Sequence, residues 1–198
     1  MTTGARLTAG GTATDPGAAG RASAGRASAG GAVLVLVGFM GAGKTTVGRL
    51  VAGKLGVPFT DSDFVIEDRA GKPVRSIFAD HGEPAFRQLE HEVIADLLSG
   101  PGSVLALGGG AAAHPGTRDL LAAVPVAYLR VSYAEAMHRV GGDRGRPMLT
   151  RPDIEQLYAE RDPLYAAAAT LTVDTDGRPP QEIARSILAA LEGPDQGR

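Results

Sequence analysis

The stretch Gly38–Thr45, with the sequence GFMGAGKT, constrains this chain more than any other feature. It fits the pattern G-x-x-x-x-G-K-[ST] of the phosphate-binding P-loop. An unbroken aliphatic run at 32–37 precedes it, which is typical of a parallel strand buried on both faces, and a helical pattern follows at 45–55. Glycines in this setting turn backbone N–H groups toward a polyphosphate at the positive end of the helix. The sequence therefore predicts nucleotide binding, with a chance glycine-rich turn as the alternative.

The last two residues of this motif predict how the nucleotide is held. Lys44 is expected to reach the β- and γ-phosphates, and the hydroxyl of Thr45 is expected to be a ligand of Mg²⁺. Both roles depend on the order strand, glycine loop, helix, because the loop works physically only there.

Composition excludes several other classes of protein. The chain has 198 residues, of which 43% are hydrophobic, and this suits one globular domain. Its net charge of −2 argues against a nucleic-acid partner. The absence of cysteine excludes a disulfide framework and a thiolate metal site, and the apolar runs are too short to span a bilayer. We expect a protein of a reducing compartment with no nucleic-acid or membrane partner.

Both ends of the chain are predicted to lie outside the domain. Residues 1–31 consist almost entirely of Ala, Gly, Thr, Ser and Arg and repeat the sequence RASAG at 21 and 26. Such a low-complexity stretch cannot bury enough surface to become ordered. A disordered tail is favoured, although a transit peptide or an over-long start of the chain would also fit. The domain is then expected over 32–193, with a second tail at 194–198.

Strand-like and helical patterns alternate along the domain. Five strands are predicted, at 32–37, 57–60, 103–107, 125–131 and 171–173. Helical patterns follow them, including 83–98 after a break at Gly82, 133–140, 152–169 and 180–191. This order predicts a three-layer α/β fold with a parallel sheet. Pro163 is expected to kink or divide the helix that contains it.

Two aspartates follow the second predicted strand. Asp61 and Asp63 are placed to face a magnesium nucleotide and its acceptor, because ligands of such folds bind at the carboxyl ends of strands. Asp63 could equally be the N-cap of the next helix. The third predicted strand carries no aspartate, so Asp61 is the expected substitute for organising Mg²⁺.

Three further features suit phosphoryl transfer, and each has an ordinary alternative. Arg87 could bind substrate, or it could pair with Glu83 or Glu90 at helical spacing. The triglycine segment, Gly108–Gly110, could bind an anion or form a permissive turn. The glycine- and arginine-rich loop at 141–147 could be a flexible lid or a solvated loop. The four histidines are scattered and suggest no metal site.

Together these motifs resemble the shikimate kinase family, a nucleoside-monophosphate-kinase-like branch of the P-loop proteins, from about residue 33 to 191. The motifs that carry the resemblance are GFMGAGKTTVG at 38–48, DSD at 61–63, IF at 77–78, GE at 82–83, FR at 86–87, Glu90, GGG at 108–110, RP at 146–147 and RDPLY at 161–165. The sequence departs from the family pattern at Ala106, where many relatives carry a hydroxyl, at Met148, which replaces a leucine, and in a short segment between Arg146 and Arg161.

The resemblance implies a sheet order of 2-3-1-4-5, a flexible lid at about 139–150, and transfer of the ATP γ-phosphoryl group to the 3-hydroxyl of shikimate. It implies one Mg²⁺ ion and a step in chorismate and aromatic amino acid biosynthesis. We expect a monomeric protein of the cytoplasm. Gluconokinase is the nearest rival enzyme, and a nucleotide-sensing P-loop module without catalysis is a rival of another class.

The resemblance also implies a role for each site residue. The expected nucleotide contacts are Gly41, Ala42, Gly43, Lys44, Thr45, Thr46, Arg139, Arg146 and Arg178. The expected shikimate contacts are Asp63, Arg87, Gly108, Gly109, Gly110 and Arg161, with apolar walls from Val74, Phe78, Phe86, Pro147 and Met148. Thr45 and Asp61 are implied for the metal. Lys44, Asp63 and Arg146 are implied as catalytic residues.

Overall fold

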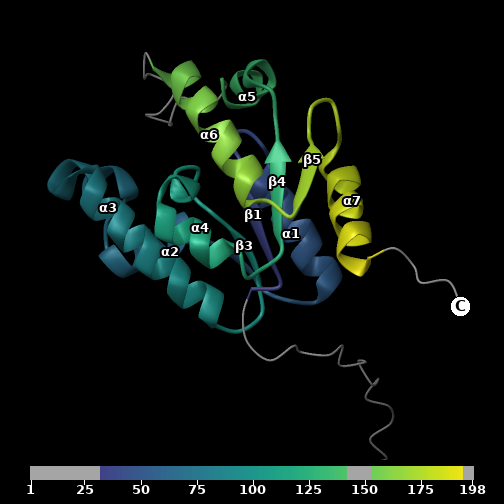
Figure 1. Ribbon diagram of the computed structural model, residues 1–198, viewed down its shortest axis with the longest axis horizontal. Helices are drawn as coiled ribbons and strands as arrows, with labels where there is room; N and C mark the ends of the chain where they lie inside the picture. The colour runs from purple at the N-terminus through teal and green to yellow at the C-terminus, as the bar shows by residue number, and fades with distance from the viewer. Residues whose placement is uncertain (1–31, 142–152, 194–198) are drawn as a thin grey trace, which may run out of the picture.

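A five-stranded parallel sheet forms the centre of the protein (Figure 1), seen in a computed structural model that describes residues 32–141 and 153–193. The strands are β1 Leu34–Val37, β2 Phe59–Asp61, β3 Val104–Ala106, β4 Val126–Arg130 and β5 Leu171–Asp174. Their order across the sheet is β2-β3-β1-β4-β5. The sequence-based expectations of a parallel sheet and of the order 2-3-1-4-5 are confirmed.

The central strand β1 is buried along its whole length. It pairs with β3 on one side and β4 on the other, so that Leu36 lies beside Ala106 and Ala127. Val35 and Leu36 point to opposite faces of the sheet, and neither is exposed. An unbroken aliphatic run is therefore needed here, because both faces of the strand are covered.

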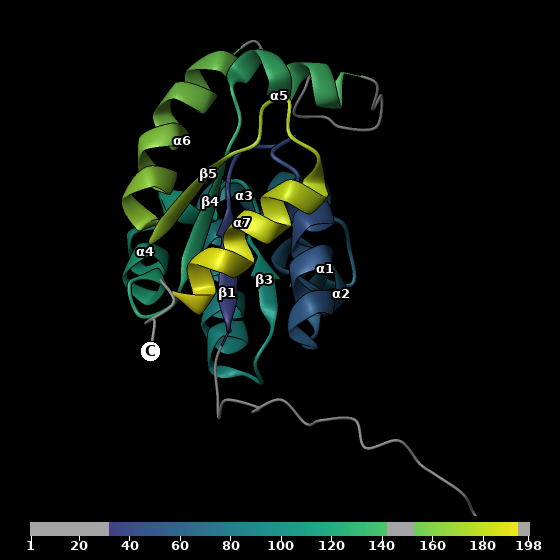
Figure 2. The ribbon, with the colours of Figure 1, turned by 90° about the vertical axis from the view of Figure 1, so that its right-hand side faces the viewer.

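Helices cover both faces of the sheet. They are α1 Lys44–Leu55, α2 Ser62–Ala70, α3 Val74–Ser99, α4 Pro115–Leu121, α5 Tyr133–Val140, α6 Ile154–Ala168 and α7 Pro180–Glu192, together with the 3-10 helix η1 Ala111–Ala113. Figure 2 shows α1 and α7 side by side on one side of the sheet and α4 and α6 on the other. This arrangement confirms the three layers predicted from the sequence. The short helix α4 was not anticipated.

Two expected helix breaks have different outcomes. Gly82 has a non-helical backbone with φ 77° and bends α3, as predicted. Pro163 was expected to kink or divide its helix, and the division is wrong, since α6 runs continuously from Ile154 to Ala168. Tertiary hydrogen bonds hold α6 on both sides of the proline: Tyr158 donates to a carbonyl after β4, and Tyr165 donates to a carbonyl after β3. These contacts compensate for the backbone hydrogen bond that proline cannot make.

Several predictions lie outside the described residues. They concern the tails at 1–31 and 194–198 and most of the lid at 139–150. Within the part of the chain that the structure describes, no helix combines the length and the apolar character needed to cross a membrane.

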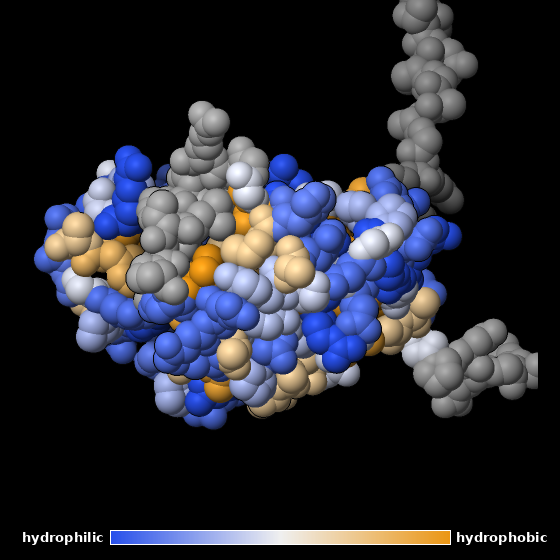
Figure 3. Space-filling model, turned by 90° about the horizontal axis from the view of Figure 1, so that it is seen from above, coloured by the Kyte–Doolittle hydropathy of each residue, from blue (hydrophilic) through white to orange (hydrophobic). Residues whose placement is uncertain are grey.

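The carboxyl ends of the strands bring the predicted site residues to one edge of the sheet. The P-loop follows β1, Asp61 ends β2, and the triglycine segment follows β3. Helix α5 follows β4, and the segment with Arg178 follows β5. Figure 3 looks down on this end of the molecule, where the described surface is largely hydrophilic with small hydrophobic patches. The fold thus gathers five separate stretches of sequence at one place.

The packing of α1 against β2 gives a stability prediction. A Cβ built on Gly48 would lie 2.4 Å from the ring of Phe59, whereas a Cβ on Gly53 of the same helix would meet nothing within 4 Å. We expect Gly48→Ala to lower the free energy of unfolding by about 1–3 kcal/mol through overpacking. Gly53→Ala should raise it by about 0.5–1 kcal/mol, because alanine favours the helix. Urea unfolding measures both, and a stabilised G48A variant would contradict the tight α1–β2 contact.

Candidate active site

The P-loop has a backbone that only glycine accommodates well. Gly41 has φ 77°, and a Cβ on Gly38 would lie 2.6 Å from the carbonyl oxygen of Leu129. The ammonium group of Lys44 donates to the carbonyl oxygens of Gly38, at 2.7 Å, and Phe39, at 3.2 Å. The lysine therefore lies across the mouth of the loop, where a phosphate would be held.

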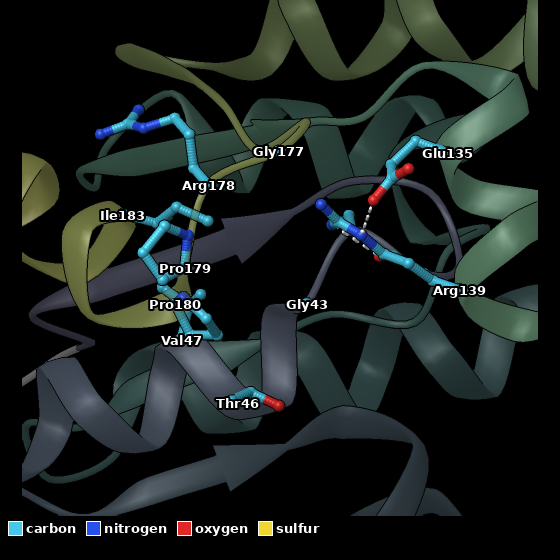
Figure 4. A pocket seen from close by; sticks show the side chains of 12 residues that line it. Gly43, Thr46, Val47, Glu135, Arg139, Gly177, Arg178, Pro179, Pro180 and Ile183 are labelled. Atoms are coloured by element: carbon cyan, nitrogen blue, oxygen red, sulfur yellow. Dashed lines mark hydrogen bonds and ion pairs between the residues drawn. The ribbon is translucent and has the colours of Figure 1, made fainter.

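A cavity of about 540 Å³ opens beside the P-loop (Figure 4). It is lined by Gly41, Ala42, Gly43, Thr46, Val47, Glu135, Arg139, Gly177, Arg178, Pro179, Pro180 and Ile183. Figure 4 shows Glu135 and Arg139 of α5 on one side and Pro179 and Pro180 on the other. Its size is in the range of small-molecule sites. Its position next to the P-loop makes it the candidate nucleotide site.

Arg139 is fixed at the junction of three elements. Its guanidinium donates to Glu135 at 2.8 Å and to the carbonyl oxygen of Gly41 at 3.2 Å. It also donates to the carbonyl oxygen of Thr175, at 2.6 Å, and to the Thr175 hydroxyl, at 3.2 Å. These bonds hold the guanidinium beside the P-loop, as its predicted contact with nucleotide phosphates requires.

Arg178 lines the same cavity, but its guanidinium points elsewhere. It donates to the carbonyl oxygen of Asp174, at 3.1 Å, and to the hydroxyl of Ser186 in α7, at 2.8 Å. Figure 4 shows this group turned away from Arg139. The structure therefore presents the stem of Arg178 to the cavity and its charge to α7.

The two residues predicted for the metal lie together. The Thr45 hydroxyl is 3.3 Å from Asp61 Oδ2, and Asp61 Oδ1 accepts a hydrogen bond from the backbone N–H of Asp63 at 3.1 Å. The N-cap of α2 is thus Asp61, and the alternative that Asp63 is the cap is wrong. Among the described residues no three metal-ligating side chains gather. A hydroxyl beside one carboxylate suits Mg²⁺, which keeps several waters and uses few protein ligands.

The triglycine segment lies against four predicted or adjacent site residues. A Cβ on Gly108 would lie 2.3 Å from Asp63 Oδ1, and a Cβ on Gly110 would lie 2.1 Å from the Arg87 guanidinium. A Cβ on Gly109 would lie 3.7 Å from both the Arg161 guanidinium and the Tyr165 hydroxyl. Side chains from α2, α3 and α6 therefore meet at these three residues.

Arg87 makes the helical ion pairs that its sequence position also allowed. It contacts Glu83 at 3.1 Å and Glu90 at 2.6 Å, and the Glu90 side chain is only 1% exposed. Its guanidinium also lies over the rings of Phe78 and Phe86. The pairing and the position against Gly110 coexist, because Glu83 and Glu90 hold the guanidinium at the acceptor side of the site.

Burial changes the ionisation of both carboxylates at this place. The pKa of Asp63 is raised mainly by burial and then by the charge of Asp61, while Lys44 and Arg87 oppose the shift. Burial also raises the pKa of Glu90, against the opposing charge of Arg87. A carboxylate with a raised pKa is a stronger base than an exposed one, which suits proton abstraction.

Some residues of the site were not assigned from the sequence. Ser62, Glu90 and Tyr165 belong to motifs quoted above, but none of them was given a role in binding, although Glu90 was named as a possible partner of Arg87. The buried hydroxyl of Ser62 accepts a hydrogen bond from the Gly108 N–H at 2.9 Å. The spacing of Glu90 from Arg87 and of Tyr165 from Arg161, three and four residues along a helix, was the available signal.

Other predictions for this site have mixed outcomes. Arg146, Pro147 and Met148 lie outside the described residues. Val74, Phe78 and Phe86 pack in one hydrophobic cluster, and their role as apolar walls stays a prediction. The histidines are not all scattered, because the rings of His91 and His114 lie 4.7 Å apart.

Known proteins resemble this chain closely. The family model for shikimate kinase matches residues 40–192. A shikimate kinase of Mycobacterium avium is 46% identical over 168 residues, covering 83% of this chain and 96% of its own. One of Thermobifida fusca is 49% identical over 160 residues, covering 79% and 93%. A solved structure of shikimate kinase from Acinetobacter baumannii in complex with shikimate has a TM-score of 0.77 and 37% identity, covering 84% and 96%.

The raised pKa of Asp63 gives a prediction about stability. A carboxyl whose pKa is higher in the folded state than its ordinary value of 3.8 binds its proton more tightly when folded, so its ionised form destabilises the fold. We expect Asp63→Asn to raise the free energy of unfolding near pH 7. This gain should disappear as the pH falls below about 4.

Asp80 is a matched control, because its pKa is shifted in the opposite direction from that of Asp63. Its hydrogen bond to Lys72 lowers its pKa, so Asp80→Asn should lower the free energy of unfolding near pH 7. Urea titrations at several pH values measure both variants. A D63N variant that is destabilised at pH 7 would contradict the unfavourable burial of Asp63.

Proposed function

The chain belongs to the shikimate kinase family, and from this premise we propose how its residues transfer the γ-phosphoryl group of ATP to shikimate. The reaction serves aromatic amino acid biosynthesis and makes the protein an ATP-dependent phosphotransferase. The observation that carries the residue assignments is the convergence of Asp63, Arg87 and Arg161 on the triglycine segment.

Arg87 and Arg161 bind the carboxylate of shikimate. Their guanidinium groups lie against neighbouring glycines, Gly110 and Gly109, and come from different helices. Guanidinium forks hold a planar carboxylate with two hydrogen bonds each, and the glycine N–H groups add further donors. Phe78 and Phe86, which pack beside Arg87, supply an apolar surface for the ring.

Asp63 binds the acceptor hydroxyl and accepts its proton. The oxygen of the 3-hydroxyl forms a bond to the γ-phosphorus of ATP, while the bond from that phosphorus to the β–γ bridging oxygen breaks and ADP leaves. The hydroxyl proton passes to Asp63. The raised pKa of this carboxylate favours the transfer, and its position against Gly108 sets it next to the carboxylate-binding residues.

The nucleotide occupies the cavity beside the P-loop. Residues 41–46 surround its phosphates, Lys44 contacts the β- and γ-phosphates, and Arg139 adds positive charge from α5. Thr45 and Asp61 are the residues that would hold one Mg²⁺, which neutralises phosphate charge when bound. The stem of Arg178 contributes to the wall near the base.

The remaining assignments stay predictions. Arg146, in a lid at about 139–150, would stabilise the transferring phosphoryl group. A monomeric state, a location in the cytoplasm, and a domain at 32–193 between two tails are expected in the same way. Neither gluconokinase activity nor a non-catalytic nucleotide-binding role is favoured, because two arginines meet the triglycine segment beside an aspartate of raised pKa.

The test is a coupled assay of ADP release with MgATP and shikimate, gluconate or no acceptor. We expect release that depends on shikimate. Arg161→Lys, which keeps the charge but loses the fork, should raise the KM for shikimate by about 10-fold or more, because hydrogen bonds between charged groups are worth about 1.5–3 kcal/mol. Its KM for ATP should stay unchanged.

Arg69→Lys is the control for this substitution. Arg69 is an exposed arginine that pairs with Asp96, and the KM for shikimate should not respond to its replacement. Release that needs gluconate, or none with any acceptor, would contradict the proposed function. If R161K raised only the KM for ATP, Arg161 would be assigned to nucleotide binding and not to shikimate binding.

The contact between Thr45 and Asp61 gives a prediction for the metal. Thr45→Val removes the hydroxyl but keeps the branched shape, so the Mg²⁺ concentration needed for half-maximal activity should rise. Thr45→Ser retains the hydroxyl and should stay close to wild type. Activity titrations with Mg²⁺ at fixed ATP measure both, and equal requirements in the two variants would remove Thr45 from the metal site.

A further inference from the structure

Tyr165 connects α6 to the triglycine segment through a buried hydrogen bond. Its hydroxyl donates to the carbonyl oxygen of Gly109, and its side chain is 2% exposed. The ring packs against that of Tyr128 in β4, with centroids 5.4 Å apart. Both the position of the ring and the direction of its hydroxyl are therefore fixed by the core of the protein.

The hydrogen bonds of the triglycine segment show why this contact matters. The N–H of Gly108 donates to Ser62, and the carbonyl oxygens of Gly108 and Gly110 accept from the backbone of η1, at 3.1 and 3.0 Å. Of the three carbonyl oxygens, that of Gly109 is the one that accepts from a side chain of a distant helix among the described residues. Within residues 32–141 and 153–193, no acceptor is bonded to the N–H groups of Gly109 and Gly110.

The planarity of the peptide bond transmits the effect of Tyr165. The carbonyl of Gly109 and the N–H of Gly110 belong to one trans peptide and point in opposite directions. Holding the carbonyl toward Tyr165 therefore turns the N–H of Gly110 to the opposite side of the peptide. The Arg87 guanidinium lies against the same glycine, 2.1 Å from the position that its Cβ would take. Glycine allows this peptide many orientations, so a tether is needed to select one.

Tyr165 also interacts with the second arginine of the site. It follows Arg161 by one helical turn, and both groups lie 3.7 Å from the Cβ position of Gly109. A hydrogen bond and the positive charge of Arg161 act on the tyrosine hydroxyl, yet burial raises the pKa of Tyr165 to about 12. The hydroxyl keeps its proton at physiological pH and remains a donor to Gly109.

We propose that Tyr165 is a positioning residue for the substrate carboxylate, which it serves by fixing the Gly109–Gly110 peptide in register with Arg87 and Arg161. This inference rests on the proposed function, because it assumes that a carboxylate binds there. Tyr165 itself need not touch the substrate. Its contribution is to present backbone N–H groups whose orientation is set before the substrate arrives.

The test compares Tyr165→Phe with Tyr158→Phe in the full chain. Tyr158 is a matched control, because it lies on the same helix and also donates to a backbone carbonyl, that of Val131 at 2.9 Å. We expect Y165F to raise the KM for shikimate by about 3- to 10-fold, as for the loss of one oriented hydrogen bond, with the KM for ATP unchanged. Y158F should leave the KM for shikimate at its wild-type value.

A second substrate separates positioning from a general structural effect. The probe is a shikimate analogue whose carboxylate is replaced by a hydroxymethyl group, assayed by kcat/KM. If Tyr165 acts through the carboxylate site, Y165F should lower kcat/KM for shikimate but leave that for the analogue close to wild type. An equal loss with both substrates, or none with either, would overturn the proposal.

A further variant guards against misfolding and tests rescue. Replacement of Tyr165 by 4-aminophenylalanine keeps the ring and a weaker N–H donor, so its KM for shikimate should fall between those of wild type and Y165F. If Y165F does not fold, this variant is compared with wild type directly, and an unchanged KM would overturn the proposal. If the wild-type protein shows no shikimate-dependent ADP release, the proposed function is overturned together with this inference. If the wild type is active and Y165F has the same kinetic constants as wild type, only this inference is overturned.

Discussion

The site depends on the close approach of four side chains to a segment that has none. Asp63 and Arg87 leave no room for a Cβ atom at Gly108 and Gly110, and Arg161 and Tyr165 lie 3.7 Å from the Cβ position of Gly109. Because three helices contribute these groups, the segment sets their spacing relative to one another. A methyl group at Gly108 or Gly110 would displace the carboxylate or the guanidinium from its place, and the acceptor side would lose its geometry.

Two carboxylates beside the triglycine segment, Asp63 and Glu90, are buried at a cost in free energy. Glu90 is almost fully buried, and Arg87 is its close partner at 2.6 Å. Both Asp63 and Glu90 have raised pKa values because desolvation outweighs the attraction of nearby cations. The fold tolerates this cost because a substrate with a carboxylate and hydroxyls would bind to groups already oriented and partly dehydrated.

The two halves of the site meet at the central strand. The nucleotide cavity lies on the α5 and α7 side of the P-loop, and the acceptor residues lie on the α2 and α3 side. Asp61 joins them, since it contacts Thr45 after β1 and caps the helix that carries Asp63. The sheet order β2-β3-β1-β4-β5 makes this possible, because it places the P-loop strand in the middle.

The sequence by itself determined the fold class and the P-loop, and it predicted most of the residues that the fold brings to one edge of the sheet. Buried parallel strands need continuous aliphatic runs, and the P-loop needs glycines at fixed positions, so both leave local signals such as 32–37 and Gly38–Thr45. Only the tertiary structure decided that Asp61 caps α2, that α6 continues through Pro163, and that Tyr165 bonds to Gly109. Each of these depends on partners far apart in the chain, and neither spacing nor composition can show which distant groups come within hydrogen-bonding distance.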